Sequence, residues 1–372
     1  MNKQILGAPG ARAKRQRSGW RRYGCGVLVL VSSSLAFMVM PVQGQNIDNL
    51  DDQLRFPSRP ADYEALRRQG DQFLAQGNEA ERRGDYLKAI DLWRQAIALY
   101  DQIDDLRGLG LAHDYIGLTY AQLGRWEAAE FALRRRLAIA RDRGDRQGEV
   151  FGLNNLGTVL LRHENPRGAT DSFEQALAIA RQLQSIEGQG LSLSNLGLAA
   201  TQRGDYELAI KRLREALVFR RRAPDPVAQA NTLNLLGAAY QANGQPNQAI
   251  PEYRLARWYA QEGRDLRGQF RAHHGLTTAY AERQDWPLVF HTLREWLALA
   301  QETNQPRQTL QALTLSARYL LRLGDGRQAS QFYTQAIALA RQLQDAQAEA
   351  ILANEFSQLV YGFPFGLPRS LD

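Results

Sequence analysis

Asparagine side chains recur through the middle of this 372-residue chain. Asn154 and Asn155 are followed by Asn195 and then by Asn231 and Asn234, at nearly equal intervals. Asparagine is a mediocre helix former, so its recurrence in helical sequence asks for a reason. Each side-chain amide offers a donor and an acceptor, and a row of amides can hold the backbone of an extended peptide whatever its side chains. An equally supported alternative is that Asn154, Asn155 and Asn195 bond neighbouring helices or turns.

Residues that could carry catalysis or bind a metal lack the spacing that those chemistries need. His113 and His273 fall in a packing position, and His273 and His274 point to different faces of a helix, so they cannot simply chelate one ion together. The adjacent carboxylates Asp51–Asp52 and Asp104–Asp105 are typical of solvated turns. The chain has no phosphate-binding loop, no nucleophile elbow and no paired-histidine zinc motif. We therefore predict no enzyme activity, no cofactor and no metal.

A repeat of 40 residues, without insertion or deletion, organises the chain. Its unit, Leu191–Arg222, reads as two amphipathic helices joined by a turn at Arg203–Asp205. One position holds a small residue in every copy: Ala89, Ala129, Ala169, Ala209, Ala249, Val289 and Ala329. One helical turn later stands a large apolar residue: Trp93, Leu133, Phe173, Leu213, Tyr253, Leu293 and Tyr333. A glycine recurs in the first helix: Gly77, Gly117, Gly157, Gly197 and Gly237. Such a pair cannot bury its apolar surface alone and needs neighbouring copies.

The run from Leu236 to Tyr240, followed by Ala249, Tyr253 and Ala256, resembles the tetratricopeptide repeat. The segment Leu137–Gly157 is similar to a longer, 40-residue subclass found in adaptors related to the LGN protein and in kinesin light chains. The resemblance covers residues 61–361. It implies an all-α, right-handed α-solenoid of seven helix-turn-helix repeats, and Ala346–Val360 is predicted to cap its last repeat.

The same resemblance implies that the first helix of each pair lines the concave side of the solenoid and forms a peptide-binding groove. The candidate groove residues are Leu111, Asp114, Leu118, Phe151, Asn154, Asn155, Thr158, Leu191, Asn195, Leu198, Asn231, Asn234, Arg271, His274, Thr278, Gln311, Arg318 and Arg322. Leu118 and Leu198 fit the core between repeats slightly better than the groove. Arg271, Arg318 and Arg322 favour an acidic segment at the C-terminal end of the groove.

Residues 1–44 differ from the rest and are predicted to be a signal peptide. Seven basic residues and no acidic one precede or flank the apolar run Val27–Met40, which ends at Pro41 and is followed by small residues at Val42–Gly44. The run is shorter than the roughly 20 residues of a membrane-spanning helix. We expect cleavage near Gly44 and export to the periplasm or the outside of the cell. The alternative is an uncleaved anchor at residues 27–40.

The distribution of charge along the chain bears on the kind of partner that it can bind. Residues 45–372 contain 39 basic and 39 acidic residues, so the excess positive charge belongs to residues 1–44 and does not indicate nucleic-acid binding. Residues 45–60 are predicted to be a flexible lead and residues 362–372 a disordered tail.

These observations favour a non-enzymatic scaffold that binds an extended peptide or a helix of another protein. The alternative is a regulatory or accessory subunit of a partner enzyme. We expect no small-molecule substrate, and membrane contact only if the N-terminal segment stays uncleaved.

Overall fold

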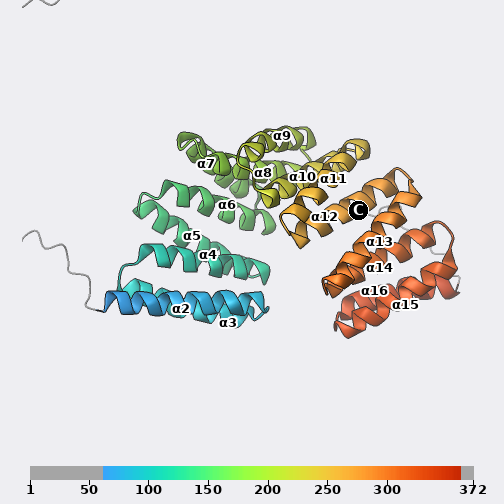
Figure 1. Cartoon of the computed structure of the whole chain (residues 1–372), viewed down its shortest axis with the longest axis horizontal. Helices are drawn as coiled ribbons and strands as arrows, with labels where there is room; N and C mark the ends of the chain where they lie inside the picture. Colours follow the sequence, from blue (N-terminus) through green and yellow to red (C-terminus); the bar gives the residue numbers. More distant parts are fainter. Residues whose placement is uncertain (1–61, 362–372) are drawn as a thin grey trace, which may run out of the picture. The chain divides into compact units, whose positions relative to one another are not determined.

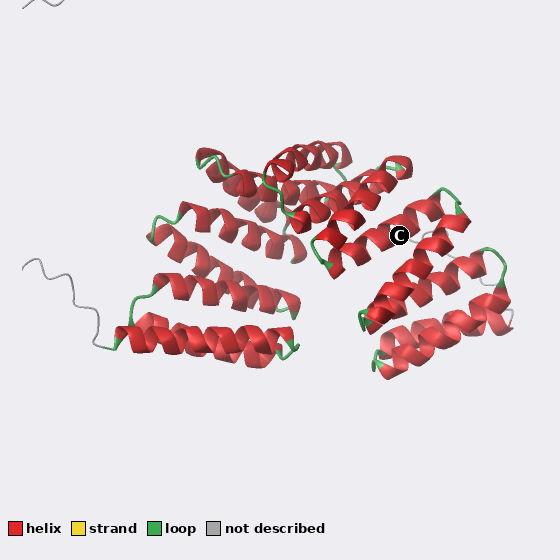
Figure 2. Cartoon of the chain, viewed as in Figure 1, coloured by secondary structure: helices red, strands yellow, loops and turns green. Residues whose placement is uncertain are grey.

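The structure is a computed structural model that describes residues 62–361, and every regular element among these residues is a helix (Figure 1, Figure 2). The expectations for residues 1–44, 45–60 and 362–372 lie outside the described residues. The first described helix begins at Tyr63, directly after Asp62, close to the predicted start of the repeats. Asp62 makes no side-chain capping hydrogen bond there.

Helices alternate between a first and a second member of each pair. The first helices are α2 (Tyr63–Arg82), α4 (Leu106–Gln122), α6 (Arg146–Arg162), α8 (Ile186–Gln202), α10 (Pro226–Ala242), α12 (Leu266–Glu282) and α14 (Pro306–Arg322). The second helices are α3 (Tyr86–Gln102), α5 (Trp126–Asp142), α7 (Pro166–Gln182), α9 (Tyr206–Arg222), α11 (Pro246–Glu262), α13 (Trp286–Glu302) and α15 (Gly326–Gln342). A last helix, α16 (Ala346–Tyr361), packs on α15.

A single residue in the left-handed region ends nearly every helix and turns the chain into the next one. Glycine takes this position at Gly84 and Gly124, with φ of 86° and 70°. Other turns use a residue with a side chain, such as Glu164 and Gln284, with φ of 55° and 57°. The turn between α9 and α10 holds Pro224, whose ring excludes positive φ, and it adopts a different geometry.

Polar side chains then cap several of the following helices. Their oxygens accept a hydrogen bond from a backbone N–H in the first turn, which satisfies a donor that has no partner within the helix. The capping residues are Asp105, Asp145, Asn165, Ser185, Asp225, Asp325 and Asp345.

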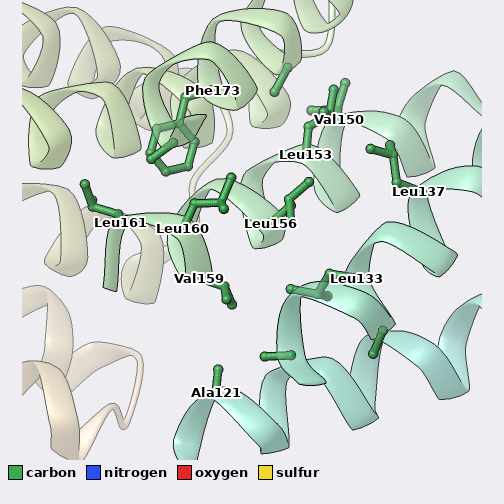
Figure 3. Packing of buried hydrophobic residues seen from close by; sticks show 14 of the residues in the cluster. Ala121, Leu133, Leu137, Val150, Leu153, Leu156, Val159, Leu160, Leu161 and Phe173 are labelled. Carbon is green, nitrogen blue, oxygen red and sulfur yellow. The ribbon is translucent and has the colours of Figure 1, made fainter. Parts of the chain in front are cut away.

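The repeat positions predicted from the sequence form the core. Every member of the small-residue position, from Ala89 to Ala329, is completely buried, and the large apolar residues beside it are at most 5 % exposed. The recurring glycines face these large residues: a methyl group on Gly117 would come within 2.7 Å of Leu133 Cγ, and one on Gly197 would overlap Leu213. Figure 3 shows the resulting layer of apolar side chains around Leu133, Leu153 and Phe173. The predicted all-α solenoid fold is thereby confirmed.

Helix contacts define an inner side of the array. Apart from helices adjacent in the chain, substantial contact joins only consecutive first helices: α2 with α4, α4 with α6, α6 with α8, α8 with α10 and α10 with α12. From α2 to α12 the first helices therefore lie closer together than the second helices do. We call the side lined by the first helices the inner side, and the side lined by the second helices the outer side.

The closing helix α16 covers the apolar edge of the last pair, as expected from the sequence. Leu352 is 2 % exposed, and Phe356 and Leu359 pack against the core of α14 and α15. Glu355 of α16 also accepts two hydrogen bonds from Arg318 of α14.

Candidate functional site

The apolar candidates on the inner side are partly accessible. Leu111 is 40 % exposed, and Phe151 and Leu191 are half-buried at the same repeat position of the next two first helices. Leu118 is 37 % exposed, which favours the groove over the core between repeats for this residue. Leu198 is half-buried and packs against the core. A discontinuous apolar line therefore follows the inner side from α4 to α8.

Asn154 lies inside the array, where its amide holds two helices together. The residue is 1 % exposed. Its Nδ2 donates to the carbonyl oxygen of Val150 at 2.8 Å and to Ser192 Oγ of α8 at 3.0 Å, and its Oδ1 accepts from Asn195 Nδ2 at 2.8 Å. These hydrogen bonds agree with the alternative prediction from the sequence, in which the asparagines bond neighbouring helices. Asn195 itself is half-buried and keeps part of its amide at the surface.

Asn231 and Asn234 also differ in burial. Asn234 is 5 % exposed and donates to the carbonyl oxygen of Gly268 at 3.1 Å, while its Oδ1 is buried without a partner. Asn231 is half-buried, and its Oδ1 accepts from Nη2 of Arg271 on the next first helix. The side chains that reach the surface are thus Asn231 and the exposed Arg271.

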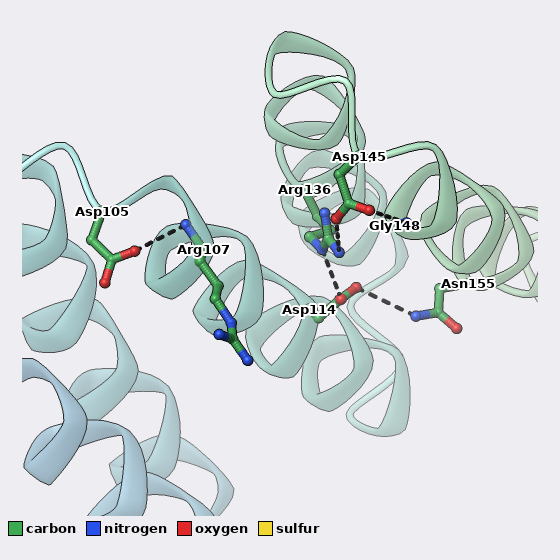
Figure 4. Close-up of polar contacts among 7 residues, drawn as sticks. All are labelled: Asp105, Arg107, Asp114, Arg136, Asp145, Gly148 and Asn155. Carbon is green, nitrogen blue, oxygen red and sulfur yellow. Dashed lines mark hydrogen bonds and ion pairs between the residues drawn. The ribbon is translucent and has the colours of Figure 1, made fainter.

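Asp114 joins three helices in a cluster that the sequence did not reveal (Figure 4). Its Oδ2 accepts from Arg136 Nε of α5 at 3.0 Å, and its Oδ1 accepts from Asn155 Nδ2 of α6 at 3.3 Å. Burial raises the pKa of the Asp114 carboxyl, and the Arg136 guanidinium acts in the opposite direction. Gly110 leaves room for Arg136, since a Cβ there would lie 3.2 Å from Arg136 Cδ. The sequence signal was the arginine at a repeat position that is alanine in five other copies.

These bonds follow a spacing rule along the inner side. Asn154 bonds residues 38 and 41 positions later, and so does Glu81, whose Oε1 accepts from Thr119 and Gln122. Residues 38 and 41 positions later are three apart and lie on one face of the next first helix. Ser194 shares a 2.9 Å hydrogen bond with Thr232, again 38 positions later. We call these bonds the polar ladder.

Three candidates at the C-terminal end are engaged with neighbours. Arg318 forms a bidentate ion pair with Glu355, with Nη2 and Oε1 2.7 Å apart. Arg322 lies over the ring of Trp286, with its Cζ 5.6 Å from the ring centroid. His274 meets Trp296 edge-on at 5.9 Å between centroids. Because Glu355 neutralises Arg318, Arg271 and Arg322 are the candidates left to attract an acidic segment.

Three further observations concern residues 62–361. No group of three His, Cys, Asp or Glu side chains among them is placed to hold a metal ion. His273 is 3 % exposed and its Nδ1 has no hydrogen-bond partner. In the same part of the chain, no helix combines the length and apolar character that crossing a membrane requires.

Comparison with known proteins identifies the repeats. Family models described as tetratricopeptide repeat match residues 112–147, 153–183 and 189–257. No curated protein matches the sequence.

Solved structures share the fold at low sequence identity. The apo form of RapI is 16 % identical with a TM-score of 0.55, and the match covers 74 % of this chain and 99 % of that one. A Rap conjugation regulator of plasmid pLS20, in complex with the Phr* peptide, is 18 % identical with a TM-score of 0.54, covering 82 % and 87 %. A signal-transduction ATPase from Pyrococcus horikoshii with a tetratricopeptide repeat sensor is 20 % identical with a TM-score of 0.56, covering 77 % of this chain and 44 % of that chain. At these identities the likeness concerns the fold alone.

Proposed function

We propose that this array of tetratricopeptide repeats binds an extended peptide or a helix of another protein on its inner side, without catalysing a reaction. One observation carries the proposal: a single repeat position presents an accessible side chain on six consecutive first helices. These side chains are Leu111, Phe151, Leu191, Asn231, Arg271 and Gln311. The first three are apolar and the last three polar or cationic, so a ligand lying along the array meets two different environments.

Rigidity of the surface supports binding of this kind. The polar ladder ties consecutive first helices together, and the recurring glycines let each first helix pack closely on the second helix of its pair. A surface held in place before binding loses less conformational entropy when a ligand arrives. Asn154 and Asn234 therefore act as positioning residues, and Asn155, Asn195 and Asn231 are the amides left to contact a ligand.

The matched Rap structures add support of a different kind. One of them holds the Phr* peptide, and another is complexed with a competence and sporulation factor. We extend peptide binding, and nothing more specific, to this chain.

Site-specific photo-crosslinking tests the proposal. A benzoylphenylalanine in place of Phe151, on the inner side, should crosslink to a partner polypeptide in cells that make this protein. The matched control replaces Phe131, which is 62 % exposed on the outer side of α5. A second inner probe at Asn231 should capture the same partner as Phe151.

The proposal fails if the control position captures the same partner equally well, or if no inner probe captures a polypeptide. A partner enzyme captured in a fixed one-to-one ratio would instead identify this chain as an accessory subunit. Loss of crosslinking after Leu191→Glu, with unchanged helicity, would locate the contact on the apolar half of the inner side.

We further propose that the repeats belong to the 40-residue subclass resembled by Leu137–Gly157, and that the protein is exported after cleavage near Gly44. The constant spacing of equivalent helices supports the first assignment. The basic and apolar sequence of residues 1–44 supports the second.

A further inference from the structure

The outer side carries two large apolar side chains that peptide binding on the inner side does not use. Val218 of α9 and Trp258 of α11 are 56 % and 51 % exposed. They occupy equivalent positions of successive second helices. At that position the five other second helices carry alanine: Ala98, Ala138, Ala178, Ala298 and Ala338. Leu255, one turn before Trp258, is a further 38 % exposed.

Five cationic side chains share this face. Together with Val218 on α9 and Trp258 on α11, they follow one another at intervals of three or four residues, apart from the consecutive Arg221 and Arg222, which places them on one side of each helix. They are Lys211, Arg214, Arg221 and Arg222 on α9 and Arg254 on α11, and all are exposed. We call these five residues, together with Val218, Leu255 and Trp258, the outer cationic patch.

Two cations of the patch, Arg214 and Arg254, lack the acidic partners that two equivalent arginines of other helices have. Arg94 and Arg134 stand at the same repeat position as Arg214 and Arg254. Arg94 pairs with Asp91 at 3.6 Å, and Arg134 pairs with Glu130 at 2.7 Å, each about one turn earlier in the helix.

In the patch, the residues one turn before the arginines are different. Lys211 precedes Arg214 and Pro251 precedes Arg254, each by three residues, and isoleucines stand one position earlier. None of the five cations forms an ion pair with any residue in the described range 62–361, although Arg214 lies over the ring of Tyr240. Arg294 of α13, at the same repeat position, also has no ion pair among these residues, so the patch is distinguished by unpaired cations together with exposed apolar side chains.

Glu252 is a nearby carboxylate, and it does not neutralise the patch. It is half-buried on α11, close enough to Arg214 and Arg221 of α9 for both to lower its pKa. Burial has the larger effect and raises the pKa of Glu252. Helix α10 packs against both α9 and α11, so the two helices of the patch are successive second helices held by the same first helix. Glu207, one turn before Lys211, and Glu262, one turn after Trp258, are also exposed on this side of α9 and α11. Three carboxylates against five cations leave a moderate local excess of positive charge.

We propose that the outer cationic patch docks this protein on an anionic lipid surface, with lipid phosphates against the five cations and Trp258 at the level of the head groups. Tryptophan is enriched at membrane interfaces because its ring is apolar and its N–H is polar. Lysine and arginine near an anionic leaflet are attracted to its negative surface potential. Residues 45–372 carry no net charge, so attraction depends on this local concentration.

The composition of the patch favours lipid over an acidic protein. Its apolar part consists of three side chains with charges between them, so most of the attraction is electrostatic. Mobile phosphate groups can meet such cations wherever they stand, whereas a protein needs carboxylates at matching positions. The contact is peripheral and adds a route to the membrane that is independent of residues 27–40.

Flotation of the full-length protein with vesicles tests the proposal. Vesicles of phosphatidylcholine with and without phosphatidylglycerol are compared for the wild type and for Lys211→Gln/Arg214→Gln/Arg254→Gln. The control, Arg94→Gln/Arg134→Gln/Arg341→Gln, removes the same charge from arginines that are ion-paired. Since each cation near an anionic surface contributes about fivefold, the patch variant should lose on the order of 100-fold in partitioning to anionic vesicles. The control should lose less than about fivefold.

Fluorescence distinguishes the patch from the basic segment at residues 1–44, which all variants share. Anionic vesicles with brominated acyl chains should quench part of the tryptophan emission of the wild type. That part should be missing in Trp258→Phe and present in the ion-pair control.

Three outcomes overturn the proposal. One is wild-type partitioning that does not depend on phosphatidylglycerol, and another is equal loss in the patch and control variants. The third is quenching by brominated lipid that is unchanged in Trp258→Phe. If anionic vesicles leave Trp258 unaffected while an acidic helical peptide alters its emission, the patch docks a protein instead. Peptide capture by the inner side is measured separately and does not depend on any of these results.

Discussion

The side-chain amide of Asn195 donates a 2.8 Å hydrogen bond to Oδ1 of Asn154 and so ties α8 to α6. The acceptor is buried and also donates to Ser192, so it has no free group for a ligand. A buried asparagine of this kind holds the helices of the inner side together. The amides that stabilise the array are thus different from the partly exposed amides that can contact a partner.

Replacing Asn154 by alanine should therefore destabilise the fold. The change removes three hydrogen bonds and leaves the Ser192 hydroxyl and the Asn195 amide without this partner, at a cost of about 1–3 kcal/mol. Urea unfolding followed by circular dichroism measures it, and Asn247→Ala, at an exposed site, should stay within about 0.5 kcal/mol. Unchanged stability together with lost partner binding would instead show that Asn154 contacts the ligand.

Gly197→Ala should destabilise the array while Gly152→Ala should not. A Cβ at Gly197 would overlap Leu213, so a helix crossing must open, at a cost of about 1–3 kcal/mol. A Cβ at Gly152 has Leu137 atoms at 3.7–3.9 Å, which is ordinary contact, and alanine is favoured over glycine in a helix by about 0.5–1 kcal/mol. Chemical denaturation measures the unfolding free energy of both variants. Equal effects would contradict the assignment of Gly197 to a close helix crossing.

The turn residues give a stabilising prediction. Gln284 holds φ of 57°, where a side chain costs energy and glycine does not, so Gln284→Gly should raise the unfolding free energy by up to about 1 kcal/mol. Gly124→Ala, at φ of 70°, should lower it by a similar amount. Thermal melting that moves both variants in the same direction would show that the turn conformation does not control stability.

His273 should make the fold sensitive to acid. Burial, reinforced by nearby Arg257, lowers its pKa to about 4, whereas the unfolded side chain has an ordinary value near 6.5. Between these values the unfolded chain binds a proton that the folded chain excludes, so stability falls as pH is lowered from neutrality towards 4. His273→Leu should abolish about 2–3 kcal/mol of the loss between neutrality and pH 4.5. Unfolding free energies of equal pH dependence in the two proteins would refute a buried neutral imidazole.

Export is tested at the N-terminus. If residues 1–44 are a cleaved signal, Edman sequencing of exported protein should begin at or near Gln45. Intact protein in a carbonate-washed membrane fraction would support an anchor at residues 27–40 instead.

The core of the fold was predictable because it follows the repeat. Leu213 and Gly197 belong to positions that recur, and a recurring small residue beside a recurring large one specifies a helix crossing wherever it occurs. The same regularity placed the turns and the closing helix, since Gly204 and Asp345 fall between periodic segments.

The inner surface was only partly predictable because neighbouring positions on one helix can differ in burial and in the helix that they contact. Asn154 and Asn155 are consecutive, yet one is buried against α8 and the other is half-buried against α4. This difference depends on how α6 is rotated about its own axis. The repeat spacing predicts that rotation only to within one residue position. Arg136 was visible as an exception to an alanine position, but its pairing with Asp114 required the structure.

Substantial contact in the array joins only helices one or two places apart in the chain. Under tension applied at its ends the array therefore transmits load in series, and one terminal pair can detach while those behind it remain folded. Each 40-residue repeat that yields would release roughly 130–140 Å of contour length. Under such a load the described array would lengthen in steps of one repeat.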